Sequence, residues 1–467
     1  MMLSLLWACA TTPQIEVQTA EMVVSDVPVP GELPNWKPPV PTVMDMENGA
    51  ALWVHADNSL PLVSIRWVFP GGSGADPEGA AGSHFLAGRM MQESSGGRDA
   101  MAVTRAFEVL AASTGIRVNR QSTVVSLDVA SERLDEALAL IADQIVRPAF
   151  SREDWQRVRD QHLLTLQQER QETSSLAREV AHQLYFGSSL LGRPVSGTPK
   201  GIEKLSLESV KGAYLSGIRP GGAAIVVVGD VDLSTIKERL EKVFSGWEGQ
   251  IEMKTPSEAQ DGRPGLFVVN DPGATQTSIR ALGEGPKAGH VDRLAATATA
   301  VVIGGSFTSR LNYLMREKKG YTYGAWAAFS AAKDFGYFSA SSSVRQNATV
   351  EALTDMYSVF DSADEPYSEM DQKKARSQLF SDEVGTAATR SKLAGVYVSR
   401  FARGLRPDGW AKELELSMST SATDMQVIGS RFINRDKMTV VLAGDVDAIT
   451  PALKAANIAF EVVEPVP

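Results

Sequence analysis

The chain has 467 residues, which is enough for two or more domains that each bury a core of their own. Apolar residues make up 43% and charged residues 22%, as in ordinary globular proteins, and no run of about 18 apolar residues predicts a membrane-spanning helix. The 46 Lys and Arg against 56 Asp and Glu give a formal net charge of -10. Without a basic run, this charge argues against nucleic acid as a partner.

The first residues resemble the signal of a bacterial lipoprotein. Residues 3–8 form a short run that is apolar apart from Ser4 and ends in Ala8, directly before Cys9, the only cysteine of the chain. We expect residues 1–8 to be a signal and Cys9 to carry the lipid, which would hold the protein at a membrane of the bacterial cell envelope, facing the periplasm. Trp7 and the lack of Lys or Arg before it depart from this pattern. The alternative is an apolar N-terminus of a cytosolic protein.

Further along the chain the pattern alternates between strands and helices. Residues 9–41 are rich in proline and predict an extended tether. Residues 62–69 and 123–129 are apolar and β-rich and predict strands, whereas residues 131–146 have apolar residues at helical spacing. The polar segment 248–265 contains two prolines and predicts a linker between domains at 42–247 and 266–467.

Two short repeats indicate a duplication. Residues 226–232, which contain Gly-Asp-Val-Asp, recur in similar form at 441–447, and Ser-Ile-Arg at 64–66 recurs at 278–280. Both repeats are displaced by nearly the same number of residues. The sequence therefore predicts two copies of a unit of about 200 residues.

Residues 84–88 read His-Phe-Leu-Ala-Gly, which is close to an incomplete zinc-protease motif. The inverted motif His-x-x-Glu-His places two imidazoles on one helix face, with a glutamate between them that serves as general base. Only His84 remains here. Ala87 stands at the position of the base and Gly88 at that of the second ligand.

Several segments together resemble the insulinase, pitrilysin and mitochondrial processing peptidase family of zinc metallopeptidases. The resemblance covers nearly everything after residue 45 and implies an α+β fold of two homologous domains, each an antiparallel sheet flanked by helices. The segments that carry it are Gly72-Ser73, Asp76-Pro77, Gly82 with the His84 segment, residues 223–232, residues 304–311 and residues 314–324.

The resemblance also implies a lost metal site. The family uses the two histidines of the motif and a glutamate roughly eighty residues later as zinc ligands, with a fourth position left for water. His84 matches the first ligand and Glu169 the distal glutamate, but Gly88 cannot bind metal and Ala87 cannot accept a proton. We therefore expect no cofactor in this chain and a zinc ion on a partner. The alternatives are that His84 is a buried packing residue and Glu169 a solvated helix charge.

A second signature lies in the other half. Many bacterial members of the family work as pairs of subunits, of which one carries zinc and the other supplies an arginine and a tyrosine; Arg316 and Tyr323 match that pair. Such donors would stabilise the oxyanion that forms during peptide hydrolysis. The alternative is that Arg316 makes a local ion pair and Tyr323 fills core space. Gly304 and Gly305 are expected to permit a tight turn or close helix packing.

These observations leave three hypotheses. The leading one is a zinc-free subunit of a heteromeric bacterial metallopeptidase, which builds half of a peptide-binding chamber and relies on a homologous zinc-bearing partner for hydrolysis. The second is a scaffold of the same fold that binds peptides or proteins without cleaving them. The third, an independently active zinc peptidase, would need replacement ligands. No two of the remaining histidines have metal-binding spacing: His55, His162, His182 and His290.

Overall fold

A computed structural model describes residues 33–187, 189, 191–251 and 262–465. The chain divides after Asn35, and residues from Trp36 onward form one compact unit that contains all strands and helices given below. Cys9, the candidate signal, most of the predicted tether and residues 252–261 of the predicted linker lie outside the described residues. In the described part of the chain, no helix is both long and apolar enough to cross a membrane.

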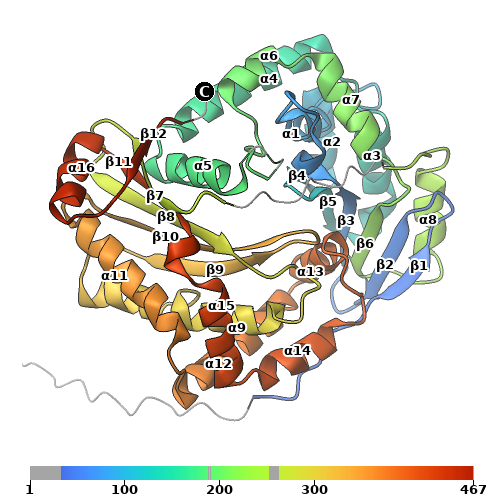
Figure 1. Cartoon of the computed structure of the whole chain (residues 1–467). Helices are drawn as coiled ribbons and strands as arrows, with labels where there is room; N and C mark the ends of the chain where they lie inside the picture. The colour runs from blue at the N-terminus through green and yellow to red at the C-terminus, as the bar shows by residue number, and fades with distance from the viewer. Residues whose placement is uncertain (1–32, 188, 190, 252–261, 466–467) are drawn as a thin grey trace, which may run out of the picture. The chain divides into compact units, whose positions relative to one another are not determined.

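The first sheet has six strands in the order β1-β2-β6-β3-β5-β4 (Figure 1). Its neighbours pair antiparallel except β2 and β6, which are parallel. The expected strands at 62–69 and 123–129 are β3 and β5. The strands are β1 Thr42–Asp45, β2 Ala51–Ala56, β3 Leu62–Pro70, β4 Ser113–Val118, β5 Ser122–Ala130 and β6 Ala224–Gly229.

The second sheet also has six strands, in the order β12-β7-β11-β8-β10-β9. Here β7 pairs parallel with both β11 and β12, and the remaining neighbours are antiparallel. Each sheet is thus mixed and not purely antiparallel as predicted, because β6 inserts parallel to β2 in the first sheet, and β11 and β12 both lie parallel to β7 in the second. The strands are β7 Gly265–Asn270, β8 Gln276–Glu284, β9 Ala325–Ala331, β10 Gly336–Arg345, β11 Thr439–Gly444 and β12 Glu461–Val463.

The strand orders confirm the predicted fold of two homologous α+β halves. The series β2-β6-β3-β5-β4 of the first sheet corresponds to β7-β11-β8-β10-β9 of the second. The register agrees as well, because Arg66 pairs with Val226 in the first sheet and Arg280 pairs with Val441 in the second. The two short repeats of the sequence are therefore the neighbouring central strands β3 and β6 and their counterparts β8 and β11.

Helices of the first half cover one face of the first sheet. Alternate residues of β2, β3, β5 and β6 form a continuous apolar core with them, as the period of two along a strand requires. The predicted helix at 131–146 is α3, preceded by one 3₁₀ turn. The helices are α1 Ser83–Met90, α2 Ala100–Val109, α3 Leu134–Val146, α4 Arg152–Glu169, α6 Pro199–Lys204, α7 Leu207–Gly217 and α8 Ile236–Val243.

The second sheet is covered in the same way by helices of the second half, which lie between its strands in sequence (Figure 1). Gly304 ends α9 against β9, where an added Cβ would lie 2.4 Å from the backbone nitrogen of Ala327, so close packing requires this glycine. The helices are α9 Arg293–Ile303, α10 Arg310–Asn312 with a π-helical extension Tyr313–Lys318, α11 Thr349–Asp361, α12 Glu369–Thr386, α14 Trp410–Ser419, α15 Ala422–Phe432 and α16 Val446–Ala455.

One helix from each half packs on the sheet of the other half. Helix α5 (Thr173–Phe186) buries Leu176, Val180 and Ala181 against β7, β8 and β11 of the second sheet. Helix α13 (Arg390–Ala402) buries Leu393, Ala394 and Tyr397 against β2, β3 and β6 of the first. The two halves are continuous in sequence but exchange a helix in space, which the predicted domain boundaries did not anticipate.

The end of the predicted tether is packed rather than extended. Trp36 makes edge-to-face contacts with Phe380 and Trp410, at ring separations of 6.3 and 5.7 Å. The carbonyl of Pro39 accepts a hydrogen bond of 3.1 Å from the hydroxyl of Tyr397. Residues 36–41 therefore belong to the compact unit, since an indole and several prolines are apolar enough to be buried there.

Candidate functional site

Asp76 holds the start of helix α1 and the imidazole of His84. Its Oδ1 accepts hydrogen bonds from the hydroxyl of Ser83 (2.7 Å), the backbone amide of His84 (2.9 Å) and Nδ1 of His84 (2.7 Å), while Oδ2 accepts one from the amide of Gly82 (2.7 Å). All of these groups are buried or nearly so. Helix α1 lacks a side-chain N-cap at Gly82, and the carboxylate of Asp76 satisfies the free amides instead.

The other ring nitrogen of His84, Nε2, is buried and has no hydrogen-bond partner among the described residues. It faces Gly217 of α7, where an added Cβ would lie 2.9 Å from Nε2. With Nδ1 bonded to Asp76 and Nε2 against a helix backbone, His84 is 4% exposed. The surroundings of this imidazole are those of a core residue.

The two altered motif positions lie inside the first core. Ala87 is 2% exposed and packs among apolar side chains of the first half. At Gly88 an added Cβ would lie 2.8 Å from Cγ2 of Val118 and 3.3 Å from Cγ2 of Ile116, both on β4. The space that a ligand side chain needs is therefore filled by β4, and Gly88 allows α1 and β4 to approach closely.

Glu169 is the last residue of α4 and is exposed. It lines a cavity of about 440 Å³ together with His162 and Phe85, and His84 is not among the lining residues. The ring of His162 packs on Phe85 at 4.9 Å, and its Nε2 is bonded to the carbonyl of Ser196 at 2.7 Å. Burial lowers the pKa of His162, so this imidazole is neutral near pH 7.

The residues at the four motif positions do not fit a zinc ion. Zinc needs three or four nitrogen, sulfur or oxygen ligands arranged around one point. His84 offers one nitrogen that faces a helix backbone, Ala87 and Gly88 offer none, and Glu169 lines a cavity that His84 does not reach. Across the described ranges, no group of three or more His, Cys, Asp or Glu side chains could hold a metal.

Arg316 and Tyr323 lie on opposite sides of a tight turn before β9. Arg316 is in the π-helical turn, where its guanidinium sits 4.5 Å from the ring of Phe307 and its Nε lies 3.3 Å from the carboxylate of Glu317. Tyr323 is 93% exposed. The turn between them passes through Gly320 at a φ of 63°, which favours glycine. Tyr323 does not fill core space, and Arg316 makes local contacts while about a third of its side chain stays exposed.

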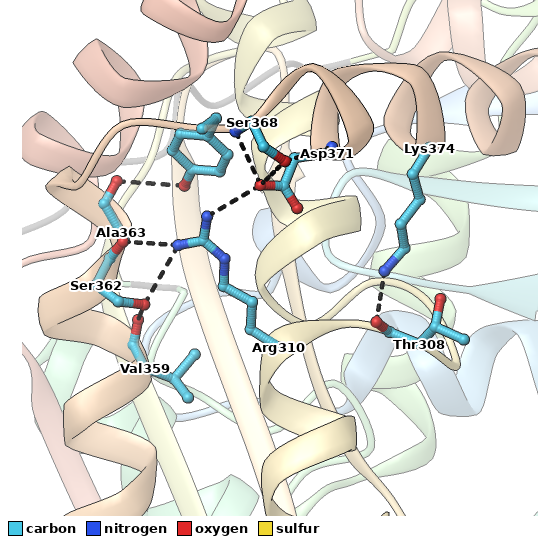
Figure 2. A network of polar contacts seen from close by, with 9 residues as sticks. Thr308, Arg310, Val359, Ser362, Ala363, Ser368, Asp371 and Lys374 are labelled. Atoms are coloured by element: carbon cyan, nitrogen blue, oxygen red, sulfur yellow. Dashed lines mark hydrogen bonds and ion pairs between the residues drawn. The ribbon is translucent and has the colours of Figure 1, made fainter.

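A polar network fixes the segment that leads into this turn (Figure 2). Nη1 of Arg310 donates to the carbonyl of Ser362 at 2.8 Å, and Nη2 lies 3.3 Å from the carboxylate of Asp371. Its guanidinium also lies 4.6 Å from the ring of Tyr367. The ammonium of Lys374 donates to the carbonyl of Thr308 at 2.5 Å. Helices α11 and α12 thereby hold the residues immediately before the Arg316 turn.

Tyr323 lines a second cavity, of about 510 Å³, between α5, β8, β10 and the turn before β9. Arg178 of α5 and Arg280 of β8 line both this cavity and the one that contains Glu169. Arg316 is not among the lining residues of either cavity. Neither Arg178 nor Arg280 was predicted from the sequence to be a site residue. The only signal for Arg280 was the Ser-Ile-Arg repeat, which predicted the duplication alone, and Arg178 lies outside that repeat.

Comparisons with known proteins agree with this fold. Residues 53–199 match the family described as Insulinase (Peptidase family M16), and residues 204–379 match the one described as Peptidase M16 inactive domain. The two matches together span more than half of the chain; the first lies in the first half, and the second runs from the end of the first half into the second. The chain belongs to the M16 peptidase family, as the sequence resemblance predicted.

Curated relatives carry names of two kinds. An "uncharacterized zinc protease" of Rickettsia bellii is 23% identical over 406 residues, covering 86% of this chain and 97% of the relative. A "non-peptidase homolog YmxG" of Helicobacter pylori is 22% identical over 270 residues, covering 57% of this chain and 62% of that protein. Members similar to this chain are thus named both as zinc proteases and as non-peptidases.

Solved structures show the same fold. The peptidase M16 inactive domain from Pseudomonas fluorescens superimposes with a TM-score of 0.82 at 22% identity, over 87% of this chain and 98% of that one. A protease from Helicobacter pylori gives a TM-score of 0.78 at 14% identity, over 88% and 100% of the two chains. At these identities the likeness concerns the fold.

Proposed function

We propose that this protein is a non-catalytic M16 subunit that pairs with a homologous zinc-bearing chain, builds half of a peptide-binding chamber and contributes Arg316 and Tyr323 to peptide hydrolysis by that partner. The packing at Gly88 is the observation that carries this proposal. A side chain at the second ligand position would meet Val118 and Ile116, so the first half cannot regain the motif without moving β4.

The second half supports a contribution in trans. Hydrolysis of a peptide bond places negative charge on the carbonyl oxygen, and fixed donors in a water-poor site can lower the barrier by about 2.7–4 kcal/mol. Arginine supplies a permanent charge and tyrosine a phenolic donor. Tyr323 is exposed, and the contact of Arg316 with Phe307 positions the guanidinium without burying it.

The test is co-expression with a homologue that has an intact His-x-x-Glu-His motif. We expect peptide cleavage only by the mixture, with Arg316→Ala lowering kcat about 10²-fold or more while the two chains still co-elute. Tyr323→Phe should also lower kcat. Arg406→Ala is the matched control, because the Arg406 side chain is 81% exposed and pairs only with nearby Asp408. Unchanged cleavage by Arg316→Ala would refute the role in trans.

The second candidate function is a peptide- or protein-binding scaffold. Strands β4 and β9 lie at the edges of the two sheets, and such strands can pair with an extended peptide through backbone hydrogen bonds. The name "non-peptidase homolog" of a relative agrees with this reading. Peptide binding without cleavage in any mixture with a zinc-bearing homologue would favour the scaffold.

We also propose that Cys9 carries a lipid and holds the protein at the cell envelope, facing the periplasm. A few acyl chains, each adding about 0.8 kcal/mol per buried methylene, are enough for stable anchoring. Labelled fatty acid should be incorporated into the wild-type chain and not into Cys9→Ser, which should move to the soluble fraction. Equal fractionation of both chains would argue against anchoring through Cys9.

A further inference from the structure

Arg66 and Arg280 occupy equivalent positions in the two halves. Arg66 on β3 lies opposite Val226 of β6, and Arg280 on β8 lies opposite Val441 of β11. Strands β6 and β11 are the ones that lead into the two Gly-Asp-Val-Asp repeats. Both are on the face of their sheet that carries the exchanged helix, since alternate residues of β3 and β8 belong to the main cores. The side chains of Arg66 and Arg280 therefore project from equivalent positions, on the same face of their sheets.

In the first half this guanidinium pairs with a carboxylate. Nη2 of Arg66 donates to both carboxylate oxygens of Asp128, at 3.0 and 2.9 Å, and to the hydroxyl of Ser391 on α13 at 2.7 Å. Nη1 donates to the carbonyls of Ile65 and Leu127. Asp128 lies opposite Ser64 in the strand pairing, two residues from the position opposite Arg66.

In the second half the carboxylate is missing. The residue opposite Ser278, which corresponds to Ser64, is Ser343, so a serine stands where the first half has Asp128. The guanidinium of Arg280 forms no ion pair or hydrogen bond with any described residue, and its Nε is buried without a partner. A buried cationic donor without a partner costs free energy, which an incoming anion would relieve.

The cavity of about 510 Å³ lies at this point and is rich in donors. Arg178 of α5 lines it beside Arg280, and no Asp or Glu is among its lining residues. Arg178 has no carboxylate within ion-pair distance in the described part of the chain; its guanidinium donates to Ser175 at 3.1 Å. The hydroxyl groups that line the cavity belong to Ser174, Ser278, Thr322, Tyr323, Ser341, Ser342 and Ser343.

The acidic residues nearby line the other cavity, where the charges of Arg170 and Arg178 both act on Glu179. Glu169 and Glu179 line the neighbouring cavity, and Glu179 lies 3.9 Å from Arg170. Burial and the charge of Arg178 lower the pKa of Arg280, although an arginine keeps its proton near pH 7. The two guanidinium groups thus repel each other, and no Asp or Glu lines the cavity of about 510 Å³ to offset their charges, in a chain whose net charge is -10.

We propose that the cavity between α5, β8 and β10 binds a carboxylate of a peptide, either a C-terminal carboxylate or an Asp or Glu side chain, which takes against Arg280 the place that Asp128 takes against Arg66. That this carboxylate belongs to a peptide rests on the proposed function. Arginine offers a planar fork that matches a carboxylate, and Trp326, which is 50% exposed at the same cavity, offers an apolar surface to the adjoining part of the peptide.

Ser343→Asp is the decisive variant, because it installs the internal carboxylate of the first half. Binding is measured by fluorescence anisotropy of a labelled, unstructured ten-residue peptide with a free C-terminus, its C-terminal amide, and versions with an internal Asp or Asn. We expect the carboxylate peptides to bind at least about tenfold more tightly than the neutral ones, and Ser343→Asp, Arg280→Gln and Arg178→Gln each to remove that preference.

Ser209→Asp is the matched control, since it adds the same charge at an exposed position on the first turn of α7 and should leave binding unchanged. Equal affinity for acid and amide peptides, or a preference that survives Ser343→Asp, would overturn the proposal. Inorganic phosphate that binds through Arg280 while no peptide does would show a free-anion site and also refute it.

The outcomes separate this site from the proposed function. If the isolated chain prefers acidic peptides through Arg280 but no zinc-bearing homologue makes it support cleavage, the site stands and the partnership fails. If cleavage by the mixture depends on Arg316 but shows no preference for acidic peptides, the partnership stands and the site fails.

Discussion

At the scale of single residues, Gly88 has two separate consequences. It removes a metal ligand, and it lets helix α1 approach β4 so closely that Val118 occupies the space of a side chain. The second consequence matters for any attempt to restore activity. A side chain that supplied the missing metal ligand at position 88 would also have to displace Val118, a packed β-branched residue.

Gly88→His should therefore destabilise the protein, by about 1–3 kcal/mol in chemical denaturation, because the added side chain overpacks the core. In a Val118→Ala background the penalty should be smaller, since the nearest atom is gone. Gly212→His is the control, because Gly212 is an exposed position of helix α7 with no atom within 4 Å of an added Cβ. An equal effect of His at positions 88 and 212 would contradict the packing argument.

His182 gives a pH dependence with a defined sign. Burial, followed by the charge of Arg120, lowers the pKa of His182 from 6.5 to about 3, and its Nδ1 is bonded to the carbonyl of Arg178 at 2.9 Å. The ring also packs against Phe186 and Tyr337. The folded protein keeps this imidazole neutral, whereas the unfolded chain takes up a proton below about pH 6.5.

The stability that His182 contributes is therefore present above about pH 6.5 and is lost as the pH falls toward 3. Between pH 7 and pH 5 the wild-type protein should lose on the order of 1–2 kcal/mol more than His182→Phe, measured by urea denaturation at each pH. His290→Gln is the control variant, because it removes a histidine at an exposed position. Parallel curves for the wild type and His182→Phe would refute the assignment.

At the scale of elements, single charged side chains hold helix α1 and the Arg316 turn in place. Asp76 caps α1 from outside the helix, and Arg310 ties the segment before the Arg316 turn to α11 and α12 (Figure 2). In both cases a charged group satisfies backbone groups that a helix end or turn leaves free. The Arg316 turn is thus held from its N-terminal side by contacts that do not involve Arg316.

Arg310→Met keeps the apolar stem but loses the hydrogen bonds to Ser362 and Asp371. We expect it to lower the free energy of unfolding by about 1.5–3 kcal/mol and to lower kcat in the mixed enzyme, because the turn becomes less well positioned. Arg435→Met is the matched control: Arg435 also pairs with a carboxylate and lies over a tyrosine ring, but its side chain is 44% exposed. A similar loss in both variants would argue against a specific anchor.

At the scale of the whole molecule, the exchange of α5 and α13 links the two halves. Without α13, the first sheet would expose Trp53, Val68, Val226 and Val228, and without the second sheet α5 would expose its own apolar face. Each exchanged helix therefore stabilises the sheet of the other half rather than its own.

Residues 36–251 and 262–467 expressed separately should accordingly be poorly soluble or bind a hydrophobic dye, and co-expression should yield a soluble complex with a cooperative thermal transition. The control is the intact chain cut by a protease site inserted within residues 252–261, which should stay assembled. Separate halves that each unfold cooperatively at high temperature would show that the exchanged helices are dispensable.

The sequence by itself determined the local and repeated features: the strands at 62–69 and 123–129, the helix predicted at 131–146, the duplication, and the types of residue left at positions 84, 87, 88 and 169. These follow from periodicity and residue chemistry, which act over a few neighbouring positions. It also predicted the family, because its motifs lie on both halves.

Only the tertiary structure decided where those residues lie and what surrounds them. The exchange of helices, the closure of Gly88 by β4, the exposure of Tyr323 and the missing partner of Arg280 all depend on contacts between residues far apart in the chain. The repeat placed Arg66 and Arg280 at equivalent positions, but the difference between Asp128 and Ser343 became visible only through strand register. Burial and strand pairing depend on contacts between distant parts of the chain, and local sequence does not encode them on its own.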